Sequence, residues 1–259
     1  MLISIDIGNS STGIGVFVQK GLMTRRLDTH PVRNARDYAD AIAGLLTQNH
    51  IQNHVAKEDV RCIISSVVPT HTRAMLEAVN LLAGHAVDTL LVSNRLKTGL
   101  CLRISSPVTL GADRLTNASG AFALYQRAVA VVDYGTATTV TMVDADANLI
   151  GGAIIPGLRL MNAALGSMTS QLKEVSLEQP GSALGRDTEA GIRSGIFFGT
   201  AGAVERIIVE AESETGLHFL PVITGGHCTA MQQYMTLPCE KRPDLIYESL
   251  RIIYEKNRT

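Results

Sequence analysis

Two short turns that combine an aspartate with a glycine recur in this chain, and each follows an apolar run. The first is Asp6-Ile7-Gly8-Asn9-Ser10, which follows residues 1–5. The second is Asp133-Tyr134-Gly135-Thr136, which follows residues 128–132. Short β-branched runs bounded by glycine are typical of buried strands that enter tight turns. Because the turns are about half the chain length apart, we expect two similar halves.

The residue types of these turns indicate phosphate chemistry. Glycine lets the backbone approach a ligand closely, and neighbouring amide and hydroxyl groups can face phosphate oxygens. A carboxylate next to a triphosphate is repelled unless a cation such as Mg²⁺ bridges the two. The pair of turns therefore predicts a phosphate-and-cation site to which both halves contribute.

Composition and charge exclude several classes of partner. The 259-residue chain has a net charge of −1, with 46% hydrophobic and 18% charged residues. This balance predicts a sizeable core in one large domain or two smaller ones. A nucleic-acid partner would favour a basic field, which is missing. Aromatic residues are only 4% and Trp is absent, so we expect no platform for stacking bases.

Other sequence features predict a cytoplasmic protein that does not enter a membrane. No basic segment precedes the first apolar run, and Asp6 interrupts that run, so it does not resemble a secretion signal. The apolar stretch 147–158 contains Gly-Gly and Pro-Gly and is too short to span a bilayer. The four cysteines form no C-x-x-C pair, which favours reduced thiols.

Hydrophobic periodicity predicts an α/β fold. In the first half, we expect strands at 1–6, 13–19, 22–30, 61–68 and 90–93, and helices at 34–50, 72–83 and from 113. In the second half, we expect strands at 128–133, 138–144, 149–155 and 221–224, and helices at 158–172, 188–211 and 244–256. Hairpin-like strands followed by helices, twice over, fit two α/β domains with a cleft between them. We place these domains at 1–115 and 116–259.

The segment Gly111-Ala112-Asp113-Arg114 joins a carboxylate to a guanidinium at the expected start of a helix. A helix N-terminus favours anions, and Arg can hold a carboxylate with two hydrogen bonds. Asp113 could therefore accept a proton from a substrate hydroxyl while Arg114 anchors an acidic substrate. A salt bridge that only stabilises the helix start is the alternative explanation.

Two glycine patterns each leave two interpretations open. Gly191, Gly195 and Gly199 recur every four residues on a predicted helix, where each costs about 1 kcal/mol relative to Ala. Close packing would offset that cost, either within the subunit or at a dimer interface. Gly225-Gly226, after a short strand, could let a purine stack against bare backbone on the adenosine side, or could simply end the strand.

Seven ordered blocks of the sequence resemble the type III pantothenate kinases, also called Bvg accessory factor proteins. The blocks are MLISIDIGNS, SSVVP, GADR, VVDYGTATT, GGAIIPG, GRDT and ITGG, and they extend over nearly the whole chain. The resemblance implies two actin-like (ribonuclease H-like) domains of the acetate and sugar kinase superfamily, a nucleotide cleft between them, and a homodimer. It implies ATP-dependent phosphorylation of pantothenate to phosphopantothenate, the first step of coenzyme A biosynthesis. The implied cations are Mg²⁺ or another divalent ion, and K⁺ or NH₄⁺.

The resemblance also implies roles for individual residues. Asp113 would be the catalytic proton acceptor, Asp6 would help to hold the divalent ion, and Asp133 would bind the monovalent cation. The implied contacts to pantothenate come from Gly111, Ala112, Asp113, Arg114 and Thr188. The implied contacts to ATP come from Asp6, Ile7, Gly8, Asn9, Ser10, Ser11, Thr12, Gly13 and Thr136.

Four positions depart from the pattern usual in that family. Ser10 replaces a commoner Thr, and Asp187 replaces the usual Asn before Thr188. Thr141 stands where many members have a second Asp, and Ile104 stands where a substrate-contacting Tyr is usual. The phosphate side is thus intact, whereas the substrate side lacks a polar contact. The alternatives are a kinase of the same fold for another small hydroxy acid and a non-catalytic nucleotide-binding paralogue.

Overall fold

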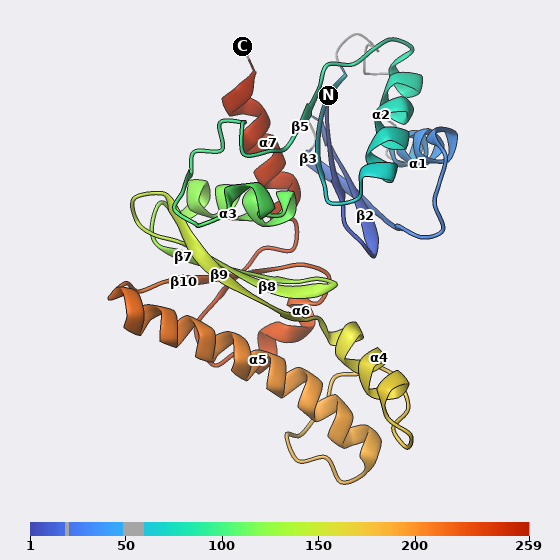
Figure 1. Ribbon diagram of the computed structural model, residues 1–259. Helices are drawn as coiled ribbons and strands as arrows, with labels where there is room; N and C mark the ends of the chain where they lie inside the picture. The colour runs from blue at the N-terminus through green and yellow to red at the C-terminus, as the bar shows by residue number, and fades with distance from the viewer. Residues whose placement is uncertain (19–20, 49–59, 259) are drawn as a thin grey trace. The chain divides into compact units, whose positions relative to one another are not determined.

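The computed structural model describes residues 1–18, 21–48 and 60–258 and divides the chain into two compact units (Figure 1). Unit 1 comprises Met1–Thr98, Val108–Gly120 and Ile246–Thr259, and unit 2 comprises Gly99–Pro107 and Ala121–Leu245. The expected strand 13–19 and helix 34–50 each end in residues that lie outside the described ranges.

Unit 1 contains a five-stranded sheet in the order β3-β2-β1-β4-β5. The strands are β1 (Leu2–Ile7), β2 (Ser11–Val18), β3 (Gly21–Asp28), β4 (Arg61–Ser66) and β5 (Thr89–Leu91). β1 and β2 pair antiparallel, as do β2 and β3, whereas β4 runs parallel to both β1 and β5. The helices of this unit are α1 (Ala35–Gln48), α2 (Pro69–Ala83), the start of α3 (Ala112–Tyr125) and nearly all of α7 (Leu245–Asn257).

Local sequence signals explain where these helices begin and end. The side chain of Asn34 accepts hydrogen bonds from the N–H groups of Arg36 and Asp37, so it caps α1. Helix α2 begins at Pro69, three residues before the expected start, because proline is well accommodated in the first turn. It ends at Gly84, whose left-handed φ of 77° and N–H bond to the Asn80 carbonyl form a glycine C-cap.

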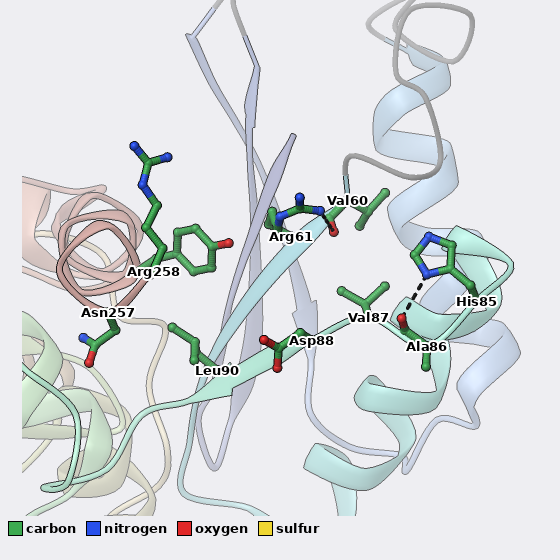
Figure 2. Close-up of a pocket in the computed structure, with 10 residues that line it drawn as sticks. Val60, Arg61, His85, Ala86, Val87, Asp88, Leu90, Asn257 and Arg258 are labelled. Atoms are coloured by element: carbon green, nitrogen blue, oxygen red, sulfur yellow. Dashed lines mark hydrogen bonds between the residues drawn. The ribbon is translucent and has the colours of Figure 1, made fainter.

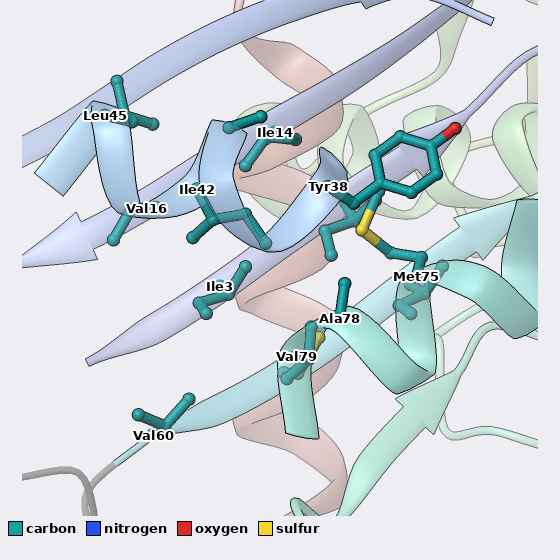
Figure 3. Packing of buried hydrophobic residues seen from close by; sticks show 14 of the residues in the cluster. Ile3, Ile14, Val16, Tyr38, Ile42, Leu45, Val60, Met75, Ala78 and Val79 are labelled. Carbon is teal, nitrogen blue, oxygen red and sulfur yellow. The ribbon is translucent and has the colours of Figure 1, made fainter. Parts of the chain in front are cut away.

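Helices α1 and α2 cover one face of the unit 1 sheet (Figure 3). Ile3, Ile14 and Val16 point from the sheet toward Ile42 of α1 and Val79 of α2, and all five are fully buried. Successive strand residues face opposite sides, so Ile63 of β4 packs on the other face, where α7 contributes Leu250 and Ile253. The C-terminal helix therefore belongs to unit 1, although the sequence analysis placed it in the second domain.

Unit 2 contains a six-stranded sheet in the order β11-β10-β7-β8-β9-β6. The strands are β6 (Cys101–Leu102), β7 (Val129–Tyr134), β8 (Ala137–Val143), β9 (Asn148–Pro156), β10 (Leu220–Thr224) and β11 (Glu240–Lys241). The helices are α4 (Leu158–Met168), α5 (Thr188–Thr215) and the short α6 (Cys228–Met231). Helix α5 lies along one face of this sheet (Figure 1), where Ile196, Phe197 and Val204 join the buried cluster that includes Ala130 and Val132.

The two sheets repeat one topology, which confirms the predicted α/β fold with similar halves. In each, three consecutive strands form an antiparallel meander whose first strand then pairs in parallel with a later one. The order β3-β2-β1-β4-β5 of unit 1 thus corresponds to β9-β8-β7-β10-β11 of unit 2. The short elements β6, β11 and α6 were not predicted, because segments of two to four residues carry too little periodicity.

Two further features concern the helices and the cysteines. Within the described ranges, the helices are too short or too polar to cross a bilayer. The four cysteines, Cys62, Cys101, Cys228 and Cys239, are free thiols. Burial raises the pKa of the Cys62 thiol to about 12, so this group stays protonated at neutral pH.

Candidate functional site

The first aspartate turn lies at the carboxyl end of β1. Asp6 is the penultimate residue of that strand, and its Oδ1 accepts a hydrogen bond of 2.9 Å from the Ser65 hydroxyl on β4. The turn is closed by a 3.0 Å bond from Gly8 N–H to the Ser11 carbonyl. Asn9 and Ser10 are exposed at its tip. The turn therefore presents backbone and short polar groups to solvent beside a carboxylate of fixed orientation.

The later residues of this segment are buried. Thr12 is fully buried in β2, with its hydroxyl 3.3 Å from the hydroxyl of Thr29. A Cβ atom at Gly13 would overlap the Tyr247 side chain of α7, which covers this part of the strand. Of the segment Asp6–Gly13, the residues at the turn itself are thus the accessible ones.

The second aspartate turn occupies the equivalent position in unit 2. Asp133 is the penultimate residue of β7, and it pairs across to Thr224 of β10 as Asp6 pairs to Ser65 of β4. Gly135 N–H donates to the Ala137 carbonyl at 3.2 Å and closes this turn. The exposed residue at the turn is Thr136. Asp6 and Asp133 thus have the same residue type and occupy equivalent positions in the two sheets.

Glycine backbone surrounds the Asp133 carboxylate closely. A Cβ atom at Gly225, where φ is +87°, would overlap Asp133 Oδ1, and one at Gly135 would lie 3.2 Å from the same oxygen. Gly157 donates its N–H to the Thr136 carbonyl at 3.1 Å, and a Cβ atom there would overlap the carbonyl oxygens of Gly135 and Thr136. A carboxylate and carbonyl oxygens in one turn are the hard ligands that K⁺ and Mg²⁺ accept.

The segment Gly111–Arg114 lies next to the first turn. Val67, which follows β4, donates its N–H to the Ile7 carbonyl at 3.0 Å, and its side chain lies 4.0 Å from where a Gly111 Cβ would be. Unit 1 therefore places the start of α3 at the same edge of the sheet as the Asp6 turn. Among the implied site residues, these two groups are the ones that unit 1 brings together.

The Asp113 carboxylate folds back over the beginning of its own helix. Its Oδ1 accepts a 2.8 Å hydrogen bond from the N–H of Arg114. A Cβ atom at Gly111 would overlap that oxygen, so a larger residue there would displace the carboxylate. Burial lowers the pKa of the Arg114 guanidinium, and the negative charge of Asp113 partly opposes this shift. The half-buried pair thus consists of a carboxylate that is held by a backbone N–H and a guanidinium that is partly removed from solvent.

Thr188 lies in unit 2, as do three of the four departing positions, namely Ile104, Thr141 and Asp187. Thr188 is the exposed first residue of α5, and Asp187 caps that helix by accepting a 2.8 Å bond from Ala190 N–H. A cavity of about 460 Å³ adjoins this helix start and is lined by loop residues including Arg186 and by Arg193. Thr141 is 2% exposed within β8, so an Asp at this position would be buried.

Another cavity, of about 610 Å³, lies at a different edge of unit 1 (Figure 2). It is lined by Arg61 at the first position of β4, by Asp88 and Leu90 near β5, and by Asn257 and Arg258 near the end of α7. In the parallel register, Arg61 pairs with Leu2 whereas Ser65 pairs with Asp6. This cavity therefore belongs to the amino-terminal edge of the strands and not to the aspartate turn.

Ser65 and Gly157 are contributors that residue-by-residue inspection of the sequence did not single out. Ser65 orients Asp6 only because β4 pairs with β1 in a register that joins residues 59 positions apart. Gly157 approaches the second turn only because β9 returns beside β8. Both lie in sequence blocks quoted above, SSVVP and GGAIIPG, yet their roles depend on strand pairing.

Solved structures with the same arrangement show the fold. A Baf family transcriptional activator from Campylobacter jejuni superposes with a TM-score of 0.61 at 18% identity, covering 98% of each chain. The activator of 2-hydroxyisocaproyl-CoA dehydratase from Clostridium difficile, solved with bound ADPNP, gives a TM-score of 0.56 at 14% identity, covering 98% of this chain and 93% of that one. The fold is therefore the actin-like one with two mixed sheets that was expected.

Sequence comparison identifies the family. Residues 2–210 match the family model of type III pantothenate kinases. A type III pantothenate kinase from Dehalococcoides mccartyi strain CBDB1 is 35% identical over 258 residues, which is 99% of this chain and 96% of that protein. Together with the duplicated aspartate turn, this full-length similarity shows that the chain belongs to the type III pantothenate kinase family.

Proposed function

We propose that this protein transfers the terminal phosphate of ATP to the terminal hydroxyl of pantothenate, which is the first step of coenzyme A biosynthesis. The observation that carries the proposal is the pair of topologically equivalent carboxylates, Asp6 and Asp133, in a chain whose whole length matches the family. A kinase for another hydroxy acid and a non-catalytic paralogue are not favoured by the similarity to proteins named as pantothenate kinases.

The first turn supplies the phosphate-binding groups of the proposed site. Gly8 leaves the backbone accessible, and the exposed Asn9 and Ser10 offer amide and hydroxyl groups to phosphate oxygens. Asp6, fixed by Ser65, would hold a divalent cation. The described residues contain no cluster of three or more His, Cys, Asp or Glu side chains suited to a metal, which accords with an ion bound largely through substrate phosphates. Such an ion would neutralise phosphate charge in the transition state.

The second turn is the proposed site of the monovalent cation. The Asp133 carboxylate and the carbonyl oxygens around Gly135 match the ligands of K⁺ or NH₄⁺ in charge and hardness. Without such an ion, the carboxylate would repel a nearby phosphate group. Thr136, exposed at the same turn, would contact ATP.

Asp113 is the proposed proton acceptor. Phosphoryl transfer has a loose transition state, so positioning of the acceptor hydroxyl and stabilisation of charge supply most of the rate. The Arg114 N–H holds one carboxylate oxygen of Asp113, which leaves the other oxygen to take the proton of the hydroxyl. The Arg114 guanidinium would pair with the carboxylate of pantothenate, and Thr188 would contact the same substrate.

The exposed face of α5 supports a homodimer. A Cβ atom at Gly191, Gly195, Gly199 or Gly202 would meet no other atom within 4 Å, so packing inside the described subunit does not account for these glycines. Phe198 and Val209 lie on the same exposed stripe and are 36% and 46% exposed. Small residues and exposed apolar groups on one helix face fit close contact with a second copy of that helix.

One assay tests the proposed function directly. ADP release should depend on pantothenate in the presence of ATP, Mg²⁺ and K⁺, and phosphopantothenate should accumulate in equal amount. A panel of other small hydroxy acids at the same concentration is the matched control. Faster turnover with another acid would identify that acid as the substrate of the kinase. Absence of turnover with every acid, despite ATP binding, would favour the non-catalytic paralogue.

A further inference from the structure

We propose that Thr29 is a positioning residue that fixes the conformation of the phosphate turn from behind, an inference that rests on the proposed role of this turn in ATP binding. Thr29 follows β3 and is fully buried. Its hydroxyl donates a 2.7 Å hydrogen bond to the Gly8 carbonyl, and its N–H donates a 3.0 Å bond to the Ser10 carbonyl. One residue outside the turn therefore holds two of the turn's peptide groups.

The bond to Gly8 fixes the direction of a neighbouring donor. The C=O of Gly8 and the N–H of Asn9 belong to one planar trans peptide, in which the two groups point in opposite directions. Because the carbonyl is directed inward to Thr29, the Asn9 N–H is directed away from the core. This is the orientation that a backbone donor needs to bind a phosphate oxygen at the exposed tip of the turn.

Two pairs of buried polar side chains lie within an otherwise apolar cluster. The Thr12 and Thr29 hydroxyls lie 3.3 Å apart, and the Tyr38 hydroxyl lies 2.6 Å from Nδ1 of His71. All four side chains are fully buried. Tyr38 lies at the edge of the cluster that α1 and α2 form over the sheet, with its hydroxyl directed away from the aliphatic side chains (Figure 3).

The protons that are available give each pair a direction. Thr29 donates to Gly8, so it can accept from Thr12, and Tyr38 can accept from His71 if His71 carries its proton on Nδ1. Nε2 of His71 would then be an acceptor, and it is buried without a hydrogen-bond partner. A charged His71 would instead bury an unpaired N–H donor, which costs more. Burial and the nearby His30 and Arg33 lower the pKa of His71, in agreement with a neutral ring.

The test compares Thr29→Val, which keeps the shape and removes the hydroxyl, with Thr29→Ser, which keeps the hydroxyl. Thr200→Val is the matched control, because Thr200 is buried in unit 2 and donates to a helix carbonyl. Two quantities are measured: the Kd of a non-hydrolysable ATP analogue with Mg²⁺, by titration, and the separate KM values for ATP and pantothenate. Thermal unfolding monitors the stability of each variant.

Thr29→Val should weaken analogue binding and raise the KM for ATP by about 3- to 10-fold, the usual effect of one lost hydrogen bond. The KM for pantothenate should stay within about twofold, and Thr29→Ser should restore most of the affinity for the analogue. Thr200→Val should lower the unfolding temperature without changing nucleotide affinity. If Thr29→Val behaves like Thr200→Val, Thr29 is only structural and the proposal is wrong.

Two further readouts separate this proposal from the proposed function. If Thr29→Val does not fold, Thr12→Val removes the hydroxyl that lies 3.3 Å from the Thr29 hydroxyl and should weaken analogue binding in the same direction by a smaller factor. Unchanged affinity in a folded Thr12→Val variant would then overturn the inference. A wild-type protein that binds the analogue but does not phosphorylate pantothenate would contradict the proposed substrate and leave the role of Thr29 intact. A wild-type protein that binds no nucleotide would contradict both.

Discussion

The hydroxyl of Ser65 donates a hydrogen bond to Oδ1 of Asp6 across two parallel strands. This bond fixes the orientation of the Asp6 carboxylate. A carboxylate that is already oriented loses less conformational freedom when it binds a cation. The register of β1 and β4 thus contributes to the site before any ligand arrives.

Replacement of Ser65 by Ala should therefore weaken the proposed divalent-cation site. We expect the Mg²⁺ concentration at half-maximal activity to rise by about 10-fold or more, since the bond to a charged group is lost. Mg²⁺ titrations at saturating ATP would measure the effect. Ser167→Ala is the control, because Ser167 is exposed and bonds only its own helix. Equal Mg²⁺ dependence in the two variants would exclude a role for Ser65 in orienting Asp6.

Asp113→Asn should remove most turnover while nucleotide binding and unfolding temperature change little. The amide keeps the shape of the carboxylate and can still accept from the Arg114 N–H, but it cannot take a proton. A positioned base typically contributes about 10²- to 10⁴-fold. Single-turnover rates with pantothenate would measure the loss, with the exposed Asp146→Asn as control. A variant that keeps more than about half of the wild-type rate would rule out a proton acceptor at this position.

A monovalent cation should be required for activity, because Asp133 lies at the turn proposed to approach phosphate. Replacing K⁺ by a bulky organic cation at constant ionic strength should lower the rate sharply. Gly225→Ala should have a similar effect even with K⁺, because the added methyl group would overlap Asp133 Oδ1 and its φ of +87° suits glycine. Rates that do not depend on the cation would remove this ion from the proposed mechanism.

Gly195→Leu should dissociate the proposed dimer without destabilising the subunit. The site is open in the monomer, since a Cβ atom there would meet no other atom within 4 Å. In a close helix contact, however, the larger side chain should cost about 1–3 kcal/mol. Light scattering over a concentration series would measure the change in dimer dissociation. Glu214→Leu on the same helix, which is exposed near its C-terminal end, is the control. A wild-type protein that is monomeric at all concentrations would contradict the dimer itself.

The sequence predicted the elements with strong periodicity, but not the contacts that orient the aspartate turns. The strands around Asp6 and Asp133 were placed to within two residues, because apolar β-branched runs bounded by glycine are distinctive. For Gly225 the sequence left open a bare surface for a purine or a simple end of the strand, and it gave no sign of the close packing of Gly225 against Asp133. That contact depends on β10 lying beside β7, a long-range pairing that leaves no local signal.

The C-terminal helix illustrates the same limit. Its amphipathic pattern predicted residues 244–256 as a helix, and α7 is observed at Leu245–Asn257. Nothing in that pattern tells which sheet receives its apolar face. Leu250 and Ile253 pack on Ile63 of β4, so the last helix of the chain joins the unit formed by the first strands. The apolar face of a helix indicates that the helix packs against another element, but which element it packs against depends on the whole chain.

His71 should make the stability of the protein depend on pH in the weakly acidic range. Burial lowers its pKa below the ordinary value of 6.5, so the unfolded chain binds more protons than the folded one as the pH falls below that value. The free energy of unfolding should therefore decrease with falling pH, by at most about 1.4 kcal/mol per pH unit from this group. His71→Gln should reduce this slope below about pH 6.5. Urea unfolding of the wild type and the variant at several pH values would measure the two slopes, and a wild-type slope retained in His71→Gln would assign the dependence to other groups.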